Sequence, residues 1–214
     1  MNDLNRAHFF QRLLARLIEI AMRIFFLQYL ALLIVSADNL MTLLNGGLFF
    51  VVTGLLVVPV ALAFIDSFMI SKFGGSMGKL LCGLAVVNDR GEHISFWRAF
   101  FRDYIGYGVS GSLLGMGFFW ALKKERRSWH DLIADTNVVV TRNWGVFLGI
   151  VSLTVVLIVN AFTTLNLWRS FNQNRPLYES VVSDITVEIK KVIPESNKPS
   201  STPLPEKFEG SFEI

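Results

Sequence analysis

An uninterrupted apolar run is the feature that most constrains how this chain can fold. Residues 48–65 are nearly all apolar, and about 18 such residues suffice for a helix to cross a hydrocarbon core of roughly 30 Å. A bilayer offers no water to pair with backbone groups, so such a run spans it as a helix. We therefore predict a membrane-spanning helix at residues 48–70, with a kink at Pro59.

Two further apolar segments extend this into a membrane domain. Only 17% of the 214 residues are charged, against about a quarter in soluble domains. We predict additional spans at residues 13–35 and 144–167, the second of which follows a membrane domain at 1–143. Residues 168–214 are predicted to form a polar tail, with a strand at 181–192 and a disordered, proline-rich stretch at 194–205.

The distribution of basic residues orients these spans. Lysines and arginines precede the first span and follow the second, at Lys72 and Lys79, whereas residues 36–47 contain none. Basic residues favour the cytoplasmic side of a membrane. The N-terminus is therefore predicted to be cytoplasmic, and the loop at residues 36–47 external.

A glycine-rich segment at residues 96–122 allows two readings. A full crossing would place the basic residues 123–127 outside, against the charge rule. It would also separate two short β-like runs at 83–87 and 136–141, which need partners. A re-entrant or interfacial segment avoids both conflicts, so we favour it and keep the full crossing as the alternative. The fold class is then an all-α membrane protein with three transmembrane helices, this re-entrant segment and a two-stranded β element on the cytoplasmic side.

Charged residues in the first span form the first candidate site. Arg12, Arg16, Glu19 and Arg23 are spaced 4, 3 and 4 residues apart, which places them on one helical face. Ionisable groups in a span usually face a partner or a water-filled cavity. A structural ladder of ion pairs and a cation or substrate site, with Glu19 as its titrating group, both fit this pattern.

A second candidate follows the basic cluster, where His130 and Asp131 are adjacent. A histidine can titrate near neutral pH, so a proton relay, a metal site and structural pairing with arginines stay open. The sequence has one cysteine, Cys82, and no nucleophile–base motif, so we predict neither enzymatic activity nor a cofactor. Because its basic residues flank apolar runs, nucleic-acid binding is not expected either.

Four sequence elements together resemble the RDD family of bacterial membrane proteins, whose name records one arginine and two aspartates. They are Arg-Leu-Leu-Ala-Arg-Leu-Ile-Glu at 12–19, Met-Gly-Lys-Leu-Leu-Cys-Gly-Leu-Ala-Val-Val at 77–87, residues 96–102, and His-Asp-Leu-Ile-Ala-Asp-Thr-Asn-Val-Val at 130–139. The resemblance covers about residues 7–141.

By position, the family's arginine is Arg12 and its second aspartate is Asp131, while its first acid falls on Glu19. Glutamate keeps the charge on a longer side chain. Asp135 stands where the family usually has glycine. The resemblance implies a charged cluster near the cytoplasmic face, to which we assign the following six candidate binding residues: Arg12, Glu19, Lys79, Arg102, His130 and Asp131.

The function implied by the resemblance is a bacterial inner-membrane protein of undefined molecular role. Some family members are linked to sodium–proton exchange, so transport of a cation or small solute through the cluster is one hypothesis. The alternative is a non-catalytic structural or partner-binding subunit that uses its C-terminal tail. The expected partners are the bilayer, including anionic lipid, and a second copy or another membrane protein.

Overall fold

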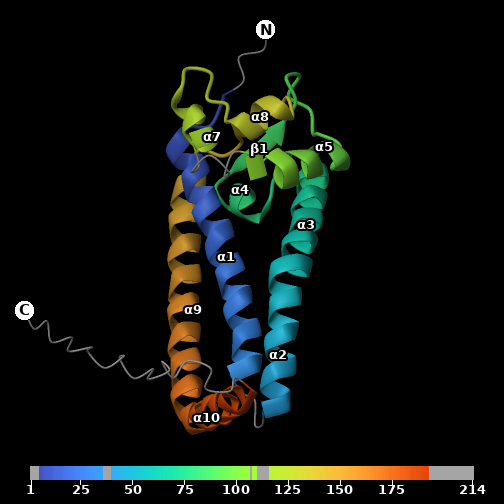
Figure 1. Ribbon diagram of the computed structural model, residues 1–214. Helices are drawn as coiled ribbons and strands as arrows, with labels where there is room; N and C mark the ends of the chain where they lie inside the picture. The colour runs from blue at the N-terminus through green and yellow to red at the C-terminus, as the bar shows by residue number, and fades with distance from the viewer. Residues whose placement is uncertain (1–4, 36–39, 107, 110–115, 193–214) are drawn as a thin grey trace, which may run out of the picture. The chain divides into compact units, whose positions relative to one another are not determined.

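The computed structural model describes residues 5–35, 40–106, 108–109 and 116–192. The chain divides into two units, Met1–Arg175 and Pro176–Ile214. The first unit contains the long helices, the sheet and the candidate residues (Figure 1). The second contains helix α10 (Arg175–Val192) apart from its first residue.

Three long helical rods run side by side in the first unit (Figure 1). Helix α1 covers Phe9–Val35 and α9 covers Gly145–Gln173. The third rod consists of α2 (Leu40–Val52), a π-helical turn η1 (Thr53–Val57) and α3 (Val58–Phe73). Pro59 lies in the first turn of α3, directly after the π-helical turn. Because proline has no N–H to donate, the irregularity predicted at this residue takes the form of a wider turn before it.

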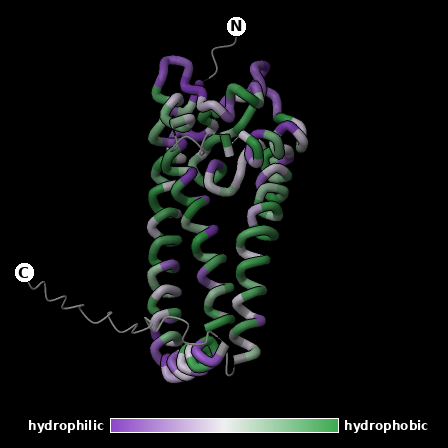
Figure 2. The backbone as a smooth tube through the Cα atoms, in the orientation of Figure 1, coloured by the Kyte–Doolittle hydropathy of each residue, from purple (hydrophilic) through white to green (hydrophobic). Residues whose placement is uncertain are grey.

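Two of these rods are long and apolar enough to cross a membrane, Leu44–Phe73 and Gly145–Gln173. Figure 2 shows mostly hydrophobic residues along both, and hydrophilic residues gathered in the loops at the sheet end. Helix α1 is 27 residues long and matches the predicted first span in position, but it carries the four charged residues. Its role as a third span therefore stays a prediction.

Polar side chains join α1 to α9 within this bundle. The Asn160 amide donates to the carbonyl of Ala21 at 3.0 Å, and the Gln28 amide donates to the Thr164 hydroxyl at 2.9 Å. Such contacts between helices satisfy polar groups that a bilayer would leave without partners. They fix the register of α9 against α1.

The predicted pair of strands is confirmed at one end of the rods. Strands β1 (Leu84–Val87) and β2 (Asn137–Val140) pair antiparallel, with Val86 opposite Val138. The N-terminal segment adds to β2, since the Ala7 N–H donates to the Val138 carbonyl at 2.9 Å. Fully buried Ile18, Ile70 and Leu84 join these strands to the long helices in one core.

Short helices surround the sheet and carry the remaining candidate residues (Figure 1). They are α4 (Met77–Leu81), α5 (Phe96–Phe100), π-helical η2 (Phe101–Gly106), α7 (Met116–Phe119), 3₁₀-helical η3 (Trp120–Leu122) and α8 (Trp129–Ile133). Both described ends of the segment 96–122 lie at the sheet end, as a re-entrant or interfacial segment requires. Residues 107 and 110–115 lie outside the described residues, so its placement relative to a membrane stays a prediction.

The strand predicted at residues 181–192 is wrong, because these residues belong to helix α10. Apolar residues alternate weakly in this segment, but its side chains make contacts at the spacing of a helix. The Lys191 ammonium lies 2.9 Å from the Glu188 carboxylate, three residues earlier, and the Thr186 hydroxyl donates to the Val182 carbonyl, four residues earlier. Helix α9 also continues to Gln173, past the predicted end at 167. The disorder predicted at 194–205 falls outside the described residues.

Gly78 sets how closely α4 approaches α1, which leads to a first prediction. A Cβ atom at this position would lie 2.2 Å from the Ala15 carbonyl oxygen, whereas one at Gly47 on α2 would meet nothing within 4 Å. We expect Gly78→Ala to lower stability by about 1–3 kcal/mol through overpacking. Gly47→Ala should be neutral, or stabilising by up to about 1 kcal/mol. Thermal unfolding of the two variants in detergent tests this, and equal melting temperatures would contradict the close approach.

Candidate functional site

Asp131 lies at the centre of the first group of charged residues. Its side chain is fully buried on α8. One carboxylate oxygen accepts hydrogen bonds from Arg102 on η2, the shorter of them 2.7 Å long. The other accepts from Arg12 on α1 at 2.5 Å, and from the hydroxyl and N–H of Ser128 at 2.7 and 3.1 Å. Asp131 therefore joins α1, η2 and α8.

The charge state of Asp131 follows from these neighbours. Burial alone would raise the pKa of its carboxyl, but the guanidinium groups of Arg102 and Arg12 and the bond from Ser128 hold that pKa well below its usual value. Arg102 also binds Asp103 at 2.7 Å. The carboxylate is consequently ionised throughout the physiological pH range.

His130 is buried beside this carboxylate, but its imidazole is uncharged. Its Nε2 atom lies 2.9 Å from the Ser128 hydroxyl and 3.5 Å from an oxygen of Asp131. Burial is the main cause that lowers the pKa of the imidazole well below 6.5; Asp131 opposes this effect, and the cations Arg102, Lys79 and Arg12 add to it. We conclude that His130 is neutral at pH 7.

The neighbouring serine, histidine and aspartate do not have the geometry of a hydrolytic triad. In such a triad the nucleophile and the orienting acid bind opposite nitrogens of the imidazole. Here Ser128 and Asp131 both approach Nε2 of His130. Ser128 instead forms a capping box with Asp131 at the start of α8, a sequence signature that identifies it as structural.

Glu19 is the centre of the second group. It is buried on α1, and one oxygen accepts from the Lys79 ammonium of α4 at 3.0 Å and from the Ser76 hydroxyl. The other oxygen accepts from Arg16 at 3.1 Å. Both oxygens of Glu19 are thus engaged by donors. Ser76, which the sequence analysis missed, also accepts from Lys79 at 2.7 Å.

The fourth charged residue of α1 lies deeper in the bundle. Arg23 forms an ion pair with Asp66 of α3 at 2.7 Å. The charged face of α1 therefore meets a different element at each level: α8 at Arg12, α4 at Glu19 and α3 at Arg23. This is the ladder of ion pairs that the spacing of the four residues predicts.

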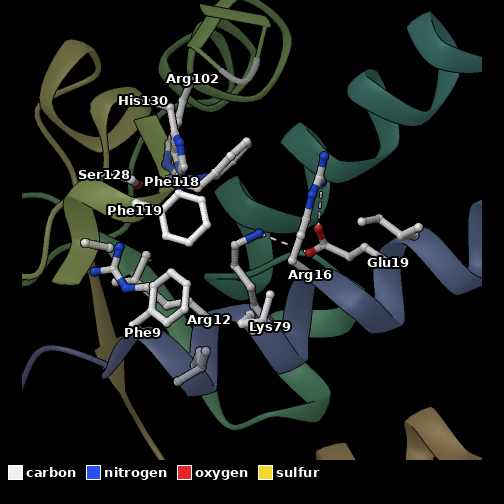
Figure 3. A pocket seen from close by; sticks show the side chains of 15 residues that line it. Phe9, Arg12, Arg16, Glu19, Lys79, Arg102, Phe118, Phe119, Ser128 and His130 are labelled. Carbon is white, nitrogen blue, oxygen red and sulfur yellow. Dashed lines mark hydrogen bonds and ion pairs between the residues drawn. The ribbon is translucent and has the colours of Figure 1, made fainter. Parts of the chain in front are cut away.

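The two groups face one cavity of about 350 Å³ (Figure 3). Of the six candidate residues, five line it, and Asp131 lies directly behind Arg12 and Arg102. The structure thus brings all six together around one space. Its volume falls at the lower end of the range for small-molecule pockets, about 300–1,000 Å³.

Aromatic and aliphatic side chains form the other wall of this cavity, and sequence reasoning missed all of them. Phe9 of α1 stacks on Phe119 of α7 at 5.9 Å between ring centroids, and Phe118 packs against His130 at 5.5 Å. Leu13 and Ile20 of α1 continue the wall. Separated in the sequence from the charged motifs, the phenylalanines of α7 carry no local signal that links them to a site.

Cationic side chains outnumber carboxylates around the cavity, and a small positive excess remains when the buried Asp131 and Asp103 behind its wall are counted. Its lining contains one carboxylate, Glu19, and four permanently positive side chains: Arg12, Arg16, Lys79 and Arg102. Among the residues that the structure describes, no group of three or more histidine, cysteine or acidic side chains could hold a metal ion. The arrangement is suited to an anion with an apolar part.

Asp135 shows how the chain accommodates a departure from the pattern of the family that it resembles. Its φ angle is +48°, in the left-handed region that favours glycine. Aspartate tolerates this region better than most residues. Its carboxylate also binds Arg127 at 3.0 Å and Arg98 at 3.1 Å, contacts that glycine cannot make.

The buried pair of Glu19 and Lys79 leads to a second prediction. Glu19→Gln should lower stability by about 3–5 kcal/mol, because it leaves the buried Lys79 ammonium without its countercharge. The double variant Glu19→Gln/Lys79→Met should recover much of this loss, which chemical denaturation can measure as a double-mutant cycle.

The exposed pair of Glu188 and Lys191, 2.9 Å apart, is the matched control. Glu188→Gln should change stability by less than about 1 kcal/mol. If Glu19→Gln had an equally small effect, Glu19 would not hold α4 against α1.

The neutral state of buried His130 leads to a third prediction. Its pKa in the folded protein is depressed, so its contribution to stability is complete above about pH 6.5 and is lost as the pH falls. Below that pH the unfolded chain takes up a proton that the folded chain does not. At pH 5.5 the loss is about 1.4 kcal/mol, or about 3–6 °C in melting temperature.

His130→Gln should remove this part of the pH dependence when melting temperatures at pH 7.5 and 5.5 are compared. His8→Gln, at an exposed histidine, should keep the wild-type dependence. Parallel pH profiles for wild type and His130→Gln would show that His130 is not the responsible group.

Comparison with known proteins places these residues in a family. The model of the RDD family matches residues 6–135, a range that contains all six candidate residues. An uncharacterised protein of Bacillus subtilis (strain 168), YxaI, is 34% identical over 90 residues. The match covers 42% of this chain and 59% of that relative, and no solved structure matches. With the family model covering more than half of its length, the chain belongs to the RDD family.

Proposed function

We propose that this membrane protein binds a small anionic solute in the cavity between α1, α4, α7 and α8, as the recognition step of transport. One observation carries the proposal: four permanently positive side chains face the cavity together with a single carboxylate. Family membership and the two apolar helices, Leu44–Phe73 and Gly145–Gln173, indicate a membrane protein.

The donors suit a phosphate or carboxylate group. Arg12 and Arg16 both line the cavity and lie one helical turn apart on α1, and Lys79 faces it from α4. Guanidinium groups bind oxyanions with paired, charge-assisted hydrogen bonds, and an ammonium adds a compact point charge. An anion that enters would meet three of these cationic groups at once.

A sodium or proton site at Glu19 receives less support. Hard cations bind to several oxygen ligands, whereas both oxygens of Glu19 already accept from Lys79, Ser76 and Arg16. A cation would have to displace the buried Lys79 ammonium and the half-buried Arg16 guanidinium. Of the two solutes that the sequence suggests, a cation and a small solute, these contacts favour the small solute. We assign it a negative charge.

The proposed topology makes α1 the third span, with the N-terminus in the cytoplasm of a bacterial cell. The charged face of α1 is directed to α8, α4 and α3, where every level has an ion pair, and this lowers the cost of placing charges in a span. The basic residues 123–127 lie at the sheet end, which by the charge rule is cytoplasmic.

A partner-binding role, as a second proposal, rests on a separate observation in α10. Its exposed residues Val182, Ile185 and Ile189 recur at helical spacing, which gives this helix an apolar face for another protein. Truncation after Asn174 would abolish such an interaction and leave anion binding intact.

The fourth prediction tests anion binding with inorganic phosphate as the probe. At constant ionic strength, phosphate should raise the melting temperature of the purified protein, whereas sodium in place of choline should not. A concentration ten times the dissociation constant stabilises by about 1.4 kcal/mol, which corresponds to roughly 3–6 °C.

Arg16→Gln should weaken phosphate binding at least fivefold, and Arg16→Lys should retain most of it. Arg90→Gln, at an exposed arginine in the turn after β1, is the control and should bind as wild type does. A sodium-dependent rise without any effect of phosphate would overturn the proposal in favour of a cation site.

A further inference from the structure

A second, apolar stripe runs along α1 beside the charged one. Leu13, Leu17, Ile20 and Ile24 each follow one of the charged residues directly in the sequence, so they share the spacing of 4, 3 and 4 and lie on one face. Their side chains are 40–45% exposed. The charged stripe faces protein, and the apolar stripe beside it faces outward.

The cavity is continuous with this outward face. Leu13 and Ile20 belong to the apolar stripe and also line the cavity, and so does Phe119 of α7, which is 58% exposed. The rim of the cavity on this side is therefore apolar and borders the surface that a bilayer would cover. A ligand can reach the arginines from the side, along α1.

The depth of the cavity in the proposed topology matches that of lipid headgroups. Tryptophans concentrate at membrane interfaces, and three exposed ones belong to the elements around the sheet: Trp97 on α5, Trp120 on η3 and Trp144 directly before α9. Trp144 precedes α9 and Trp168 lies near the end of that helix. Their separation of 24 positions spans roughly 36 Å at about 1.5 Å per residue, slightly more than a hydrocarbon core of about 30 Å.

We propose that the anion bound in this cavity is the phosphate of an anionic phospholipid, with one acyl chain along the apolar stripe of α1. This inference rests on the proposed function and identifies its ligand. Arg12, Arg16 and Lys79 receive the phosphate, and Leu17 and Ile24 contact the chain below it. The lipid enters laterally, between α1 and α7.

A free phosphate ion shares the chemistry of the headgroup but uses only half of the site. The wall of Phe9, Phe118 and Phe119 would gain no contact from it. An amphiphile covers this wall and the stripe at the same time as its charge meets the arginines, so both kinds of surface are matched by one molecule.

The test measures lipid selectivity of the full-length protein by native mass spectrometry and by competition in detergent. We expect dioctanoyl phosphatidylglycerol to bind at least tenfold more tightly than dioctanoyl phosphatidylcholine, and at least tenfold more tightly than inorganic phosphate. Raising the salt concentration should weaken the preference, because it screens the charge of the headgroup.

Two variants test the route along α1. Leu13→Trp, at the rim, should reduce phosphatidylglycerol binding at least fivefold, and Leu17→Gln, below the rim, should reduce it at least threefold. Leu56→Trp, at an exposed apolar position of η1, is the matched control and should bind as wild type does. The melting temperature of each variant without ligand shows that it is folded.

The outcomes separate this inference from the proposed function. Phosphate binding without preference for phosphatidylglycerol would overturn the lipid and leave the anion site in place. Equal binding of both lipids, or wild-type binding by folded Leu13→Trp and Leu17→Gln, would also overturn it. Absence of binding by phosphate and by both lipids would overturn the anion site as well.

Discussion

The carboxylate of Asp131 fixes the geometry on which the rest of the site depends. It accepts hydrogen bonds from Arg12 on α1 and Arg102 on η2 while it caps its own helix α8. Buried ion pairs add little stability relative to apolar packing, but breaking one is costly and their geometry is specific. The main consequence of this contact is therefore to set the rotation of α1 about its axis.

Once Arg12 is fixed, the other levels of α1 follow from helical geometry. Glu19 is directed to α4 and Arg23 to α3, where each finds an ion pair. The apolar residues one position further along are directed outward. The same rotation thus explains how a helix with four charged residues can pack in an otherwise apolar bundle, and why its apolar stripe borders the cavity.

Much of this could be predicted from the sequence because it is periodic or local. The common face of the charged residues follows from their spacing, and the pairing of β1 with β2 follows from two β-like runs and the need for a partner. The predicted cluster includes the partners Lys79, Arg102 and Asp131, but the partners outside it could not be predicted. Ser76 next to Glu19, and Asp66 opposite Arg23, result from how separate elements pack.

The errors have a similar origin. In residues 181–192 a weak alternation of apolar residues competed with a helical spacing, and the helix is the structure observed. The aromatic wall of the cavity gave no signal at all, because Phe118 and Phe119 lie in a glycine-rich segment and their neighbour Phe9 is more than 100 residues away. A site built from such remote pieces becomes visible only with the fold.

The two walls of the cavity differ in what they can contribute to binding. The polar wall is fixed, since Arg12 and Glu19 hold α8 and α4 in place through buried ion pairs. The aromatic wall rests on α7 and η3, which are only four and three residues long, and elements this short open locally at low cost. Opening there would admit the proposed ligand without breaking the contacts that maintain the fold. In the proposed function, the polar wall would select the charge of the ligand, and the aromatic wall would set how fast the ligand exchanges.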